Sequence, residues 1–271
     1  MKKLVLFSKD RPAIIAALHL PPSPASRRTT SQSIKKIIDF ALRNVEKAVR
    51  AGVPALYIQD LGDLPVSPQV QPYTIAFLSV IGARIRVEFP DLALGVCMMS
   101  HGAREPLAVA QAIGAQFVRI KVYSGAMVKS EGILQGCGYE AIRYRTEIGA
   151  EDIIILADVY DRTGKPLGEL PLVDAASFAV VQNCADALIV TGFSFDESMK
   201  MLKEVHDANL GVPLLLGGGA NAENIANALQ YADGVIVSSS FKPLSGWTRE
   251  SMLAQWDYDR MEHFMQVVVK M

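Results

Sequence analysis

The sequence predicts an α/β fold, a single (β/α)8 TIM barrel that spans residues 1–271. Three observations indicate this fold. Eight short aliphatic runs recur along the chain, segments with helical periodicity separate them, and no Pro/Ser-rich linker divides the chain. A chain of this length can bury one large core. A doubly wound open sheet is the alternative, although eight strands would be an unusually high number for it.

The eight aliphatic runs are nearly continuous, which is typical of strands buried on both faces of a parallel sheet. We expect the eighth strand to pair with the first and so to close the barrel. In chain order the runs cover residues 13–20, 54–60, 92–98, 116–122, 152–159, 186–192, 213–219 and 234–240.

The clearest helical pattern lies between the first two runs, in SQSIKKIIDFALRNVEKAVRAG, residues 31–52. Gly52 ends this pattern just before the next strand, as a helix stop does. A last helix near residues 257–269 is expected to pack as the final outer element of the barrel. The apolar stripe that the first helix should turn to the core consists of Ile34, Ile37, Ile38, Ala41, Val45 and Val49.

The bulk composition indicates a folded protein without a nucleic-acid partner. Hydrophobic residues make up 50% of the chain, charged residues make up 20%, and the net charge is -1, which leaves no basic footprint. Small molecules, other proteins and further copies of the chain in a homo-oligomer are the expected partners. The three cysteines lack disulfide or zinc-ligand spacing, which favours a cytoplasmic location. No apolar segment approaches the ~20 residues that span a bilayer, so any membrane contact would be peripheral.

Active sites of TIM barrels lie at the C-terminal ends of the strands and in the loops that follow. Four residues at these positions can carry acid–base chemistry, namely His19, Asp60, Lys121 and Asp158. Other side chains with polar or sulfur atoms at the same positions are Gln59, Asp63, Met98, Ser100, His101, Arg119, Asp161 and Thr191.

Three of these candidates have both a functional and a structural interpretation. Asp158 ends an aliphatic strand, so it needs a partner, a metal or a raised pKa, and a salt bridge with Lys121 or Arg119 is the structural alternative. Lys121 can be a Schiff-base nucleophile, an acid, a phosphate contact or a structural cation, and the last two are favoured. His19 can be an acid–base group, a metal ligand or a hydrogen-bonded structural residue.

No cofactor is expected from the sequence. Metal-ligand spacing such as H-E-x-x-H does not occur, although the carboxylates and His19 could gather around a divalent cation.

The stretch LLLGGGANAENIANAL, residues 214–229, indicates a phosphate site like that of ribulose-phosphate-binding barrels. Barrels often bind phosphate at the ends of strands seven and eight, with backbone N–H groups and a helix N-terminus, here expected near Asn221. A tight turn with Asn221 as its N-cap is the alternative. The residues expected to hold phosphate are Gly217, Gly218, Gly219, Ser238, Ser239 and Ser240, with Lys242 as an added charge.

The loop after the fourth strand, YSGAMVKSEGILQGCGYE, is longer than the usual connection of about 2 to 6 residues. Long loops in compact domains tend to be lids or binding loops. We therefore expect residues 124–138 to cover the mouth of the barrel and to vary in order with ligand.

Several of these segments together resemble the BtpA family of predicted TIM-barrel proteins, which is named after a cyanobacterial factor implicated in photosystem I biogenesis. The resemblance runs from about residue 15 to residue 242 and implies a cytoplasmic TIM barrel, membrane-associated in photosynthetic members, with relatives in sugar metabolism. The segments that carry it are ALHLPPSP, AGVPALYIQDLGDLP, GAQFVRIKVYSGAMVKSEGILQG, ILADV, ADALIVTG, PLLLGGGANAENI and ADGVIVSSSFK.

The chain departs from the family pattern at the mouth of the barrel. It has IQD where an Asn is typical, MMSHGA in place of LRND, Lys121 where an Asn is usual, and YDRTGKPLG in place of a loop with His and Lys. The phosphate end is unchanged.

Two functions follow from these features. The first is an isomerase, epimerase or aldolase-type lyase acting on a small phosphorylated metabolite, in which Asp158 moves a proton and Lys121 stabilises an oxyanion. The second is a non-catalytic or ligand-sensing factor for assembly of a membrane complex, which the changed loops favour.

Overall fold

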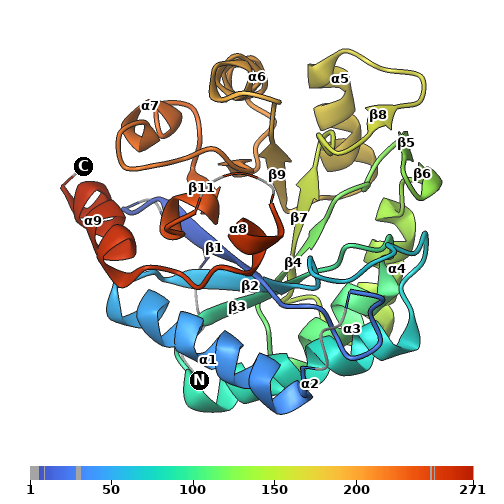
Figure 1. The fold of residues 1–271 in the computed structure, drawn as a ribbon. Coiled ribbons are helices and arrows are strands. Elements are labelled where there is room, and N and C mark those ends of the chain that lie inside the picture. The colour runs from blue at the N-terminus through green and yellow to red at the C-terminus, as the bar shows by residue number, and fades with distance from the viewer. Residues whose placement is uncertain (1–5, 9, 29–31, 245, 247, 271) are drawn as a thin grey trace.

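Eight parallel strands close into a barrel in the computed structural model, which describes residues 6–8, 10–28, 32–244, 246 and 248–270 (Figure 1). The last strand pairs with the first, with Ala13 opposite Gly234 and Ala16 opposite Val237, so the predicted closure is confirmed. Around the barrel the strands are β1 (Ala13–His19), β2 (Ala55–Gln59), β3 (Ala93–Cys97), β4 (Phe117–Ile120), β7 (Ile154–Asp158), β9 (Ala187–Val190), β10 (Leu214–Leu216) and β11 (Gly234–Val237).

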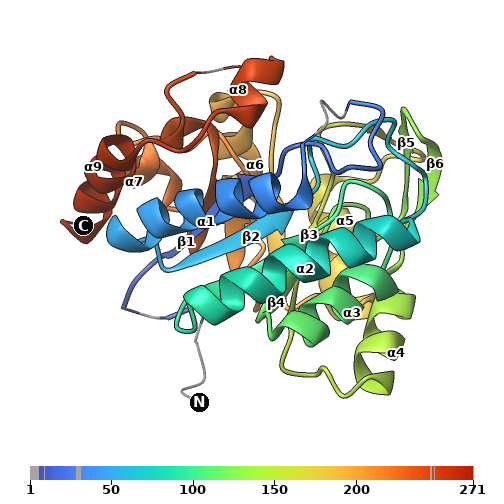
Figure 2. The same cartoon turned by 60° about the horizontal axis from the view of Figure 1, so that its bottom comes forward.

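Helices surround these strands, and Figure 2 shows α1, α2 and α3 side by side across one flank of the barrel. The predicted last helix near residues 257–269 is present as α9. The helices are α1 (Ile34–Arg50), α2 (Pro72–Glu88), α3 (Arg104–Ile113), α4 (Gly138–Glu147), α5 (Leu172–Ser177), α6 (Phe195–Asp207), α7 (Ile225–Ala228), α8 (Arg249–Leu253) and α9 (Tyr258–Val269), with a π-helical segment η1 (Phe178–Gln182) and a 3-10 helix η2 (Ser239–Phe241).

The apolar stripe of α1 differs from the predicted one at its two ends. Ile34 and Val49 are 37% and 41% exposed, whereas Asn44 and Ala48 are fully buried. Asn44 lies in the core because its side chain is satisfied on both sides. Its amide donates to the Phe40 carbonyl at 2.7 Å, and its oxygen accepts from the Trp256 N–H at 2.6 Å. A periodicity of apolar residues alone could not show this contact between α1 and the segment before α9.

The helix predicted near Asn221 begins later in the structure, at Ile225, and is only four residues long. The Asn221 side-chain oxygen accepts hydrogen bonds from the backbone N–H groups of Glu223 and Asn224, at 3.0 and 2.9 Å. These bonds hold a turn in place of the first helical turn, so Asn221 caps a turn and the helix N-cap is Asn224.

The long loop after β4 forms a hairpin at the mouth of the barrel. Its strands, β5 (Ala126–Lys129) and β6 (Gly132–Gln135), join β8 (Lys165–Pro166) in a small antiparallel sheet. Figure 1 shows this sheet above the ends of β4 and β7. Residues 124–138 thus lie where the sequence placed them, and a change in their order with ligand stays a prediction.

Over the part of the chain that the structure describes, none of the helices has the length and apolar character needed to cross a bilayer.

The barrel interior is filled by side chains that alternate along each strand with those facing the helices. Phe117, the largest apolar side chain of the interior cluster besides Tyr57, is fully buried. It fits because β3 has a glycine beside it. A Cβ atom on Gly95 would lie 2.2 Å from a carbon of the Phe117 ring.

We predict that Gly95→Ala lowers the free energy of unfolding by about 1–3 kcal/mol, because the added methyl group collides with the Phe117 ring. Phe117→Leu removes the ring atoms involved, so the double variant should lose less stability than the two single losses added together. Chemical denaturation measures all three. An unchanged midpoint for Gly95→Ala would show that the ring moves aside at no cost.

Candidate functional site

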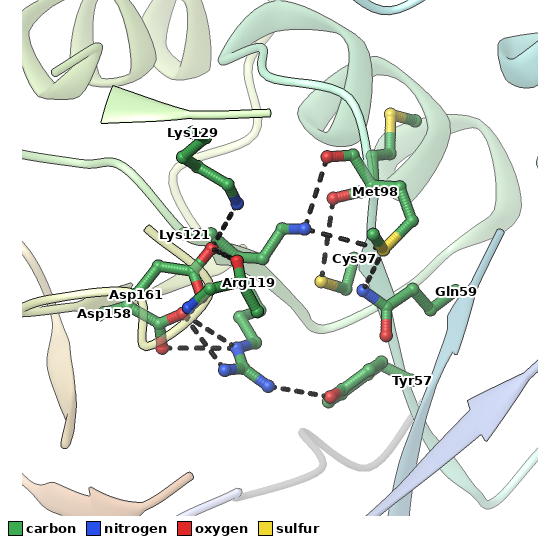
Figure 3. A network of polar contacts seen from close by, with 11 residues as sticks. Tyr57, Gln59, Cys97, Met98, Arg119, Lys121, Lys129, Asp158 and Asp161 are labelled. Carbon is green, nitrogen blue, oxygen red and sulfur yellow. Dashed lines mark hydrogen bonds and ion pairs between the residues drawn. The ribbon is translucent and has the colours of Figure 1, made fainter. Parts of the chain in front are cut away.

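Polar side chains replace the apolar filling at the end of the barrel where the strands finish (Figure 3). The alternation that directs Phe117 inward also directs Arg119 and Lys121 inward. The same alternation brings Tyr57, Cys97 and Asp158 to the inner face from β2, β3 and β7. All four predicted acid–base residues, His19, Asp60, Lys121 and Asp158, lie at this mouth.

A buried ion pair between Arg119 and Asp158 forms the centre of the site. Nε of Arg119 lies 3.2 Å from one carboxylate oxygen of Asp158, and Nη2 lies 3.0 Å from the other. Nη1 of Arg119 donates to the Tyr57 hydroxyl at 2.9 Å. The Asp158 side chain is only 2% exposed and that of Arg119 is 13% exposed. The structural alternative for Asp158, a salt bridge with Arg119, is therefore present.

Burial sets the proton affinity of this pair. It raises the pKa of Asp158 to about 6, with Asp161 acting in the same direction and Arg119 against it. Burial also raises the pKa of Tyr57 to about 12, although Arg119 opposes the shift. Burial opposes the charge of Arg119, but Asp158, Tyr57 and Cys97 together outweigh it and raise the pKa of Arg119 above its ordinary value. At neutral pH the pair is therefore ionic.

Lys121 does not hydrogen-bond to Asp158. Its Nζ donates to the backbone carbonyl of Met99 at 3.2 Å, while the N–H of the same Met99 donates to a carboxylate oxygen of Asp60 at 2.8 Å. One backbone position thus orients both Lys121 and Asp60. Burial raises the pKa of Asp60 to about 6, and the nearby charge of Lys121 limits the shift.

The hairpin is fastened to the mouth by a second buried ion pair. Nζ of Lys129 in β5 lies 2.5 Å from Oδ2 of Asp161, and the two side chains are 4% and 5% exposed. Burial opposes ionisation of Asp161, but Lys121 and Lys129 together lower its pKa to about 2. His101 adds a ring nitrogen 2.7 Å from the Gln135 carbonyl of β6. The cavity beneath the hairpin, lined by Met99, Arg119 and Lys121 among others, holds only about 10 Å³, roughly the space of one water molecule.

His19 lies on the opposite side of the mouth from the hairpin, at the end of β1. Its Nδ1 is 3.4 Å from the Ser238 hydroxyl. Burial lowers the pKa of His19, and with Lys242, Arg119 and Lys121 acting in the same direction the pKa is about 3. His19 is therefore neutral at pH 7, which suits a hydrogen-bonding residue.

The glycine loop after β10 lies beside the serine loop after β11, and the Ser240 hydroxyl donates to the Ala220 carbonyl to join them. Gly217 is closely packed, since a Cβ there would meet the Thr191 hydroxyl. Gly218 and Gly219 differ, because an added Cβ would have only ordinary contacts, at 3.8 and 3.9 Å. No described residue accepts a hydrogen bond from the backbone N–H groups of Gly218, Gly219, Ala220, Ser239 or Ser240.

The sequence pattern predicts that these strand ends lie together, but it does not indicate three of the residues that make contacts here. They are Tyr57, Lys129 and Met99, whose backbone binds both Asp60 and Lys121. Counting back two residues from Gln59 along β2 would have directed Tyr57 inward. Within the described ranges, no three His, Cys, Asp or Glu side chains cluster as metal ligands would.

The closed ring of eight parallel strands, with polar groups at one end, defines a TIM barrel. Similar solved structures include a native KDPGal structure, with a TM-score of 0.58, 16% identity and coverage of 98% of this chain and 100% of that chain. Phosphoribosyl anthranilate isomerase from Thermococcus kodakaraensis has a TM-score of 0.53 at 13% identity, and the match covers 97% of this chain and 99% of that chain. 3-Keto-L-gulonate-6-phosphate decarboxylase from Vibrio cholerae has a TM-score of 0.55 at 12% identity, and the match covers 96% of this chain and 98% of that chain. At such identities the likeness shows the fold alone.

The chain belongs to the BtpA family, whose model matches residues 10–270. It is 30% identical over 232 residues to the photosystem I biogenesis protein BtpA of Synechocystis, covering 84% of this chain and 80% of the relative. It is 31% identical over 246 residues to an uncharacterised protein of Methanocaldococcus jannaschii, covering 88% and 90%. The family resemblance predicted from the sequence is thus confirmed.

We predict that Asp158→Ala lowers the free energy of unfolding by about 3–5 kcal/mol at pH 8, because it leaves the Arg119 charge buried without its partner. Replacing both residues, in Arg119→Met/Asp158→Leu, removes the two charges together and should recover part of the loss. Denaturant titrations compare the variants. If Asp158→Ala were as stable as the parent, Arg119 would have to be solvated in the folded protein.

Proposed function

We propose that this BtpA-family barrel is an enzyme that binds a small phosphorylated metabolite and transfers a proton within it, as isomerases, epimerases and aldolase-type lyases do. The phosphate would lie at the ends of β10 and β11, and the reacting carbons would lie toward Asp158. Two solved structures of similar fold have names that include a phosphate-bearing compound, 3-keto-L-gulonate-6-phosphate and phosphoribosyl anthranilate, which supports the proposal.

One observation carries the proposal, namely the group of backbone N–H donors in the two adjoining loops. Five of them, at Gly218, Gly219, Ala220, Ser239 and Ser240, have no acceptor among the described residues. Successive backbone N–H groups form concave sites for anions without help from a side chain. An added Cβ atom at Gly218 or Gly219 would make only ordinary contacts, so no neighbouring atom crowds this part of the loop. Because α7 starts late and is short, the loop donors and not a helix dipole are the basis for this site.

The acid–base groups of the mouth suit proton transfer. Asp158 has a pKa of about 6, so it can accept a proton near neutral pH and return it. Lys121 is held by a neutral carbonyl, that of Met99, and its charge can therefore stabilise an oxyanion of the ligand. Asp60 keeps Met99 in place and is a second candidate for the acid, while His19 would hydrogen-bond in its neutral form.

A ligand larger than one water molecule needs more room than the cavity under the hairpin offers. Opening of the β5–β6 hairpin, with separation of Lys129 from Asp161, would provide it. In this proposal the hairpin is the expected lid.

We predict that Gly218→Asp abolishes binding of inorganic phosphate, because its carboxylate would occupy and repel the anion site. Gly218→Ala is the matched control. The Cβ fits with ordinary contacts, so this variant should bind within a few-fold of the parent. Calorimetric titration with phosphate, together with the thermal stability of each variant without ligand, tests the site. Equal phosphate affinity of a folded Gly218→Asp variant and its parent would contradict the proposal.

The second candidate function is a non-catalytic or ligand-sensing factor for assembly of a membrane complex. The closed Arg119–Asp158 pair and the small cavity favour it, because an acid–base group in a catalytic site is ordinarily reachable by its substrate. The relative named as a photosystem I biogenesis protein agrees with this function. Such a factor would contact the membrane peripherally.

Proton exchange in deuterated water distinguishes the two functions. We predict that the parent protein, incubated with a panel of sugar phosphates, incorporates deuterium next to the carbonyl of one of them, and that Asp158→Asn does not. NMR of the sugar phosphates measures the exchange. Binding of a sugar phosphate by the parent with no exchange and no product would favour the factor over the enzyme.

The location and the assembly state belong to the proposal as well. Cys97, Cys137 and Cys184 are all free thiols, which agrees with a reducing, cytoplasmic compartment. We propose a homo-oligomer in that compartment and a reaction that needs no cofactor.

A further inference from the structure

The loop after β7 contains a tight turn, Asp161–Gly164, with an arginine at its second position. The carboxylate of Asp161 accepts from the Thr163 N–H at 3.0 Å and from the Thr163 hydroxyl at 2.8 Å. The Asp161 carbonyl accepts from the Gly164 N–H at 3.1 Å, and the carboxylate also holds Lys129 of the hairpin. The backbone that carries Arg162 is therefore fixed from three directions.

The Arg162 side chain extends to the glycine loop after β10. A Cβ atom on Gly218 would lie 3.8 Å from Nη2 of Arg162, and no other described atom outside the neighbouring residues comes within 4 Å of it. The guanidinium group of Arg162 is therefore the nearest side-chain group to the position that this Cβ would take.

The electrostatics around Arg162 agree with an anion in that space. Burial and the nearby Arg119 lower the pKa of Arg162, while Asp161 and Asp158 act in the opposite direction. At the end of β1, Lys242, Arg119 and Lys121 all act to lower the pKa of His19. A negatively charged group next to Gly218 would offset the repulsion between Arg162 and Arg119.

We infer that Arg162 is the side chain that binds the phosphoryl group of the ligand, and that the site selects a phosphomonoester dianion over an uncharged sugar. The planar fork of a guanidinium group can bind two phosphoryl oxygens at once, which a lysine cannot do. Arg162 also lies close enough to Asp158 to interact with its charge, so a ligand held by Arg162 extends toward the proposed base. This inference rests on the proposed function, since it assumes that phosphate lies between the β10 and β11 loops.

The test measures binding of inorganic phosphate to the full chain by calorimetry. Arg162→Gln should bind roughly 10- to 100-fold more weakly than the parent, because a charge-assisted hydrogen-bonding group is lost. Arg162→Lys keeps the charge without the planar fork, so its phosphate affinity should lie between that of the parent and that of Arg162→Gln. Arg84→Gln is the matched control: this arginine lies on α2, far from the mouth, and is 52% exposed, so its replacement should leave phosphate affinity unchanged.

A second readout is independent of the folding of Arg162→Gln. The side-chain Nε–H signal of Arg162 in the NMR spectrum of the parent should shift as phosphate is added, and that of Arg84 should not. Equal phosphate affinity of the parent and a folded Arg162→Gln variant, or an unmoved Arg162 signal under saturating phosphate, overturns the inference while the proposed function stands. A parent that binds no phosphate overturns both.

Discussion

Closure of the barrel is the constraint on which the rest of the structure depends. Once β11 pairs with β1, every strand has one face toward the barrel axis and one face toward the helices, and alternate residues must follow these faces. Phe117 and Arg119 are neighbours on the inner face of the same strand, one in the apolar layer and the other in the polar layer. The polar site is therefore a product of register, since a shift of one residue in β4 would direct Arg119 to the helices and leave Asp158 unpaired.

Charges at such a place are costly unless they are paired, because removing an ion from water costs several kcal/mol even after relaxation. The mouth meets this cost with two ion pairs of different kind. Arg119 and Asp158 come from adjacent barrel strands and are fixed by the sheet. Lys129 and Asp161 come from loops, and their contact depends on where the hairpin lies. The first pair therefore joins two strands of the barrel, whereas the second joins the hairpin to the loop after β7.

The sequence was sufficient for the barrel and for the place of the site, because both follow from the repeat of aliphatic runs and from the residues that end them. The sequence was insufficient to show which side chains contact one another. Asp158 could have met Lys121 or Arg119, and only the register of β4 against β7 decides for Arg119. In the sequence Asn44 interrupts an apolar stripe. Only the structure shows that Trp256, far along the chain, is its hydrogen-bond partner. Asn221 looks like a helix cap, and its bonds to the next turn are what delay the helix.

The contact between Asn44 and Trp256 has a consequence for how the chain folds. It joins residues 212 positions apart, one in the first helix and the other in the segment before the last helix. During synthesis β1 is made long before β11, so the two strands cannot pair until β11 has been made. Trp256, which contacts Asn44, is made later still. An incomplete barrel has two open edges with unpaired backbone groups, the kind of surface that recruits strands from other molecules. Pairing of β11 with β1 removes both open edges at once.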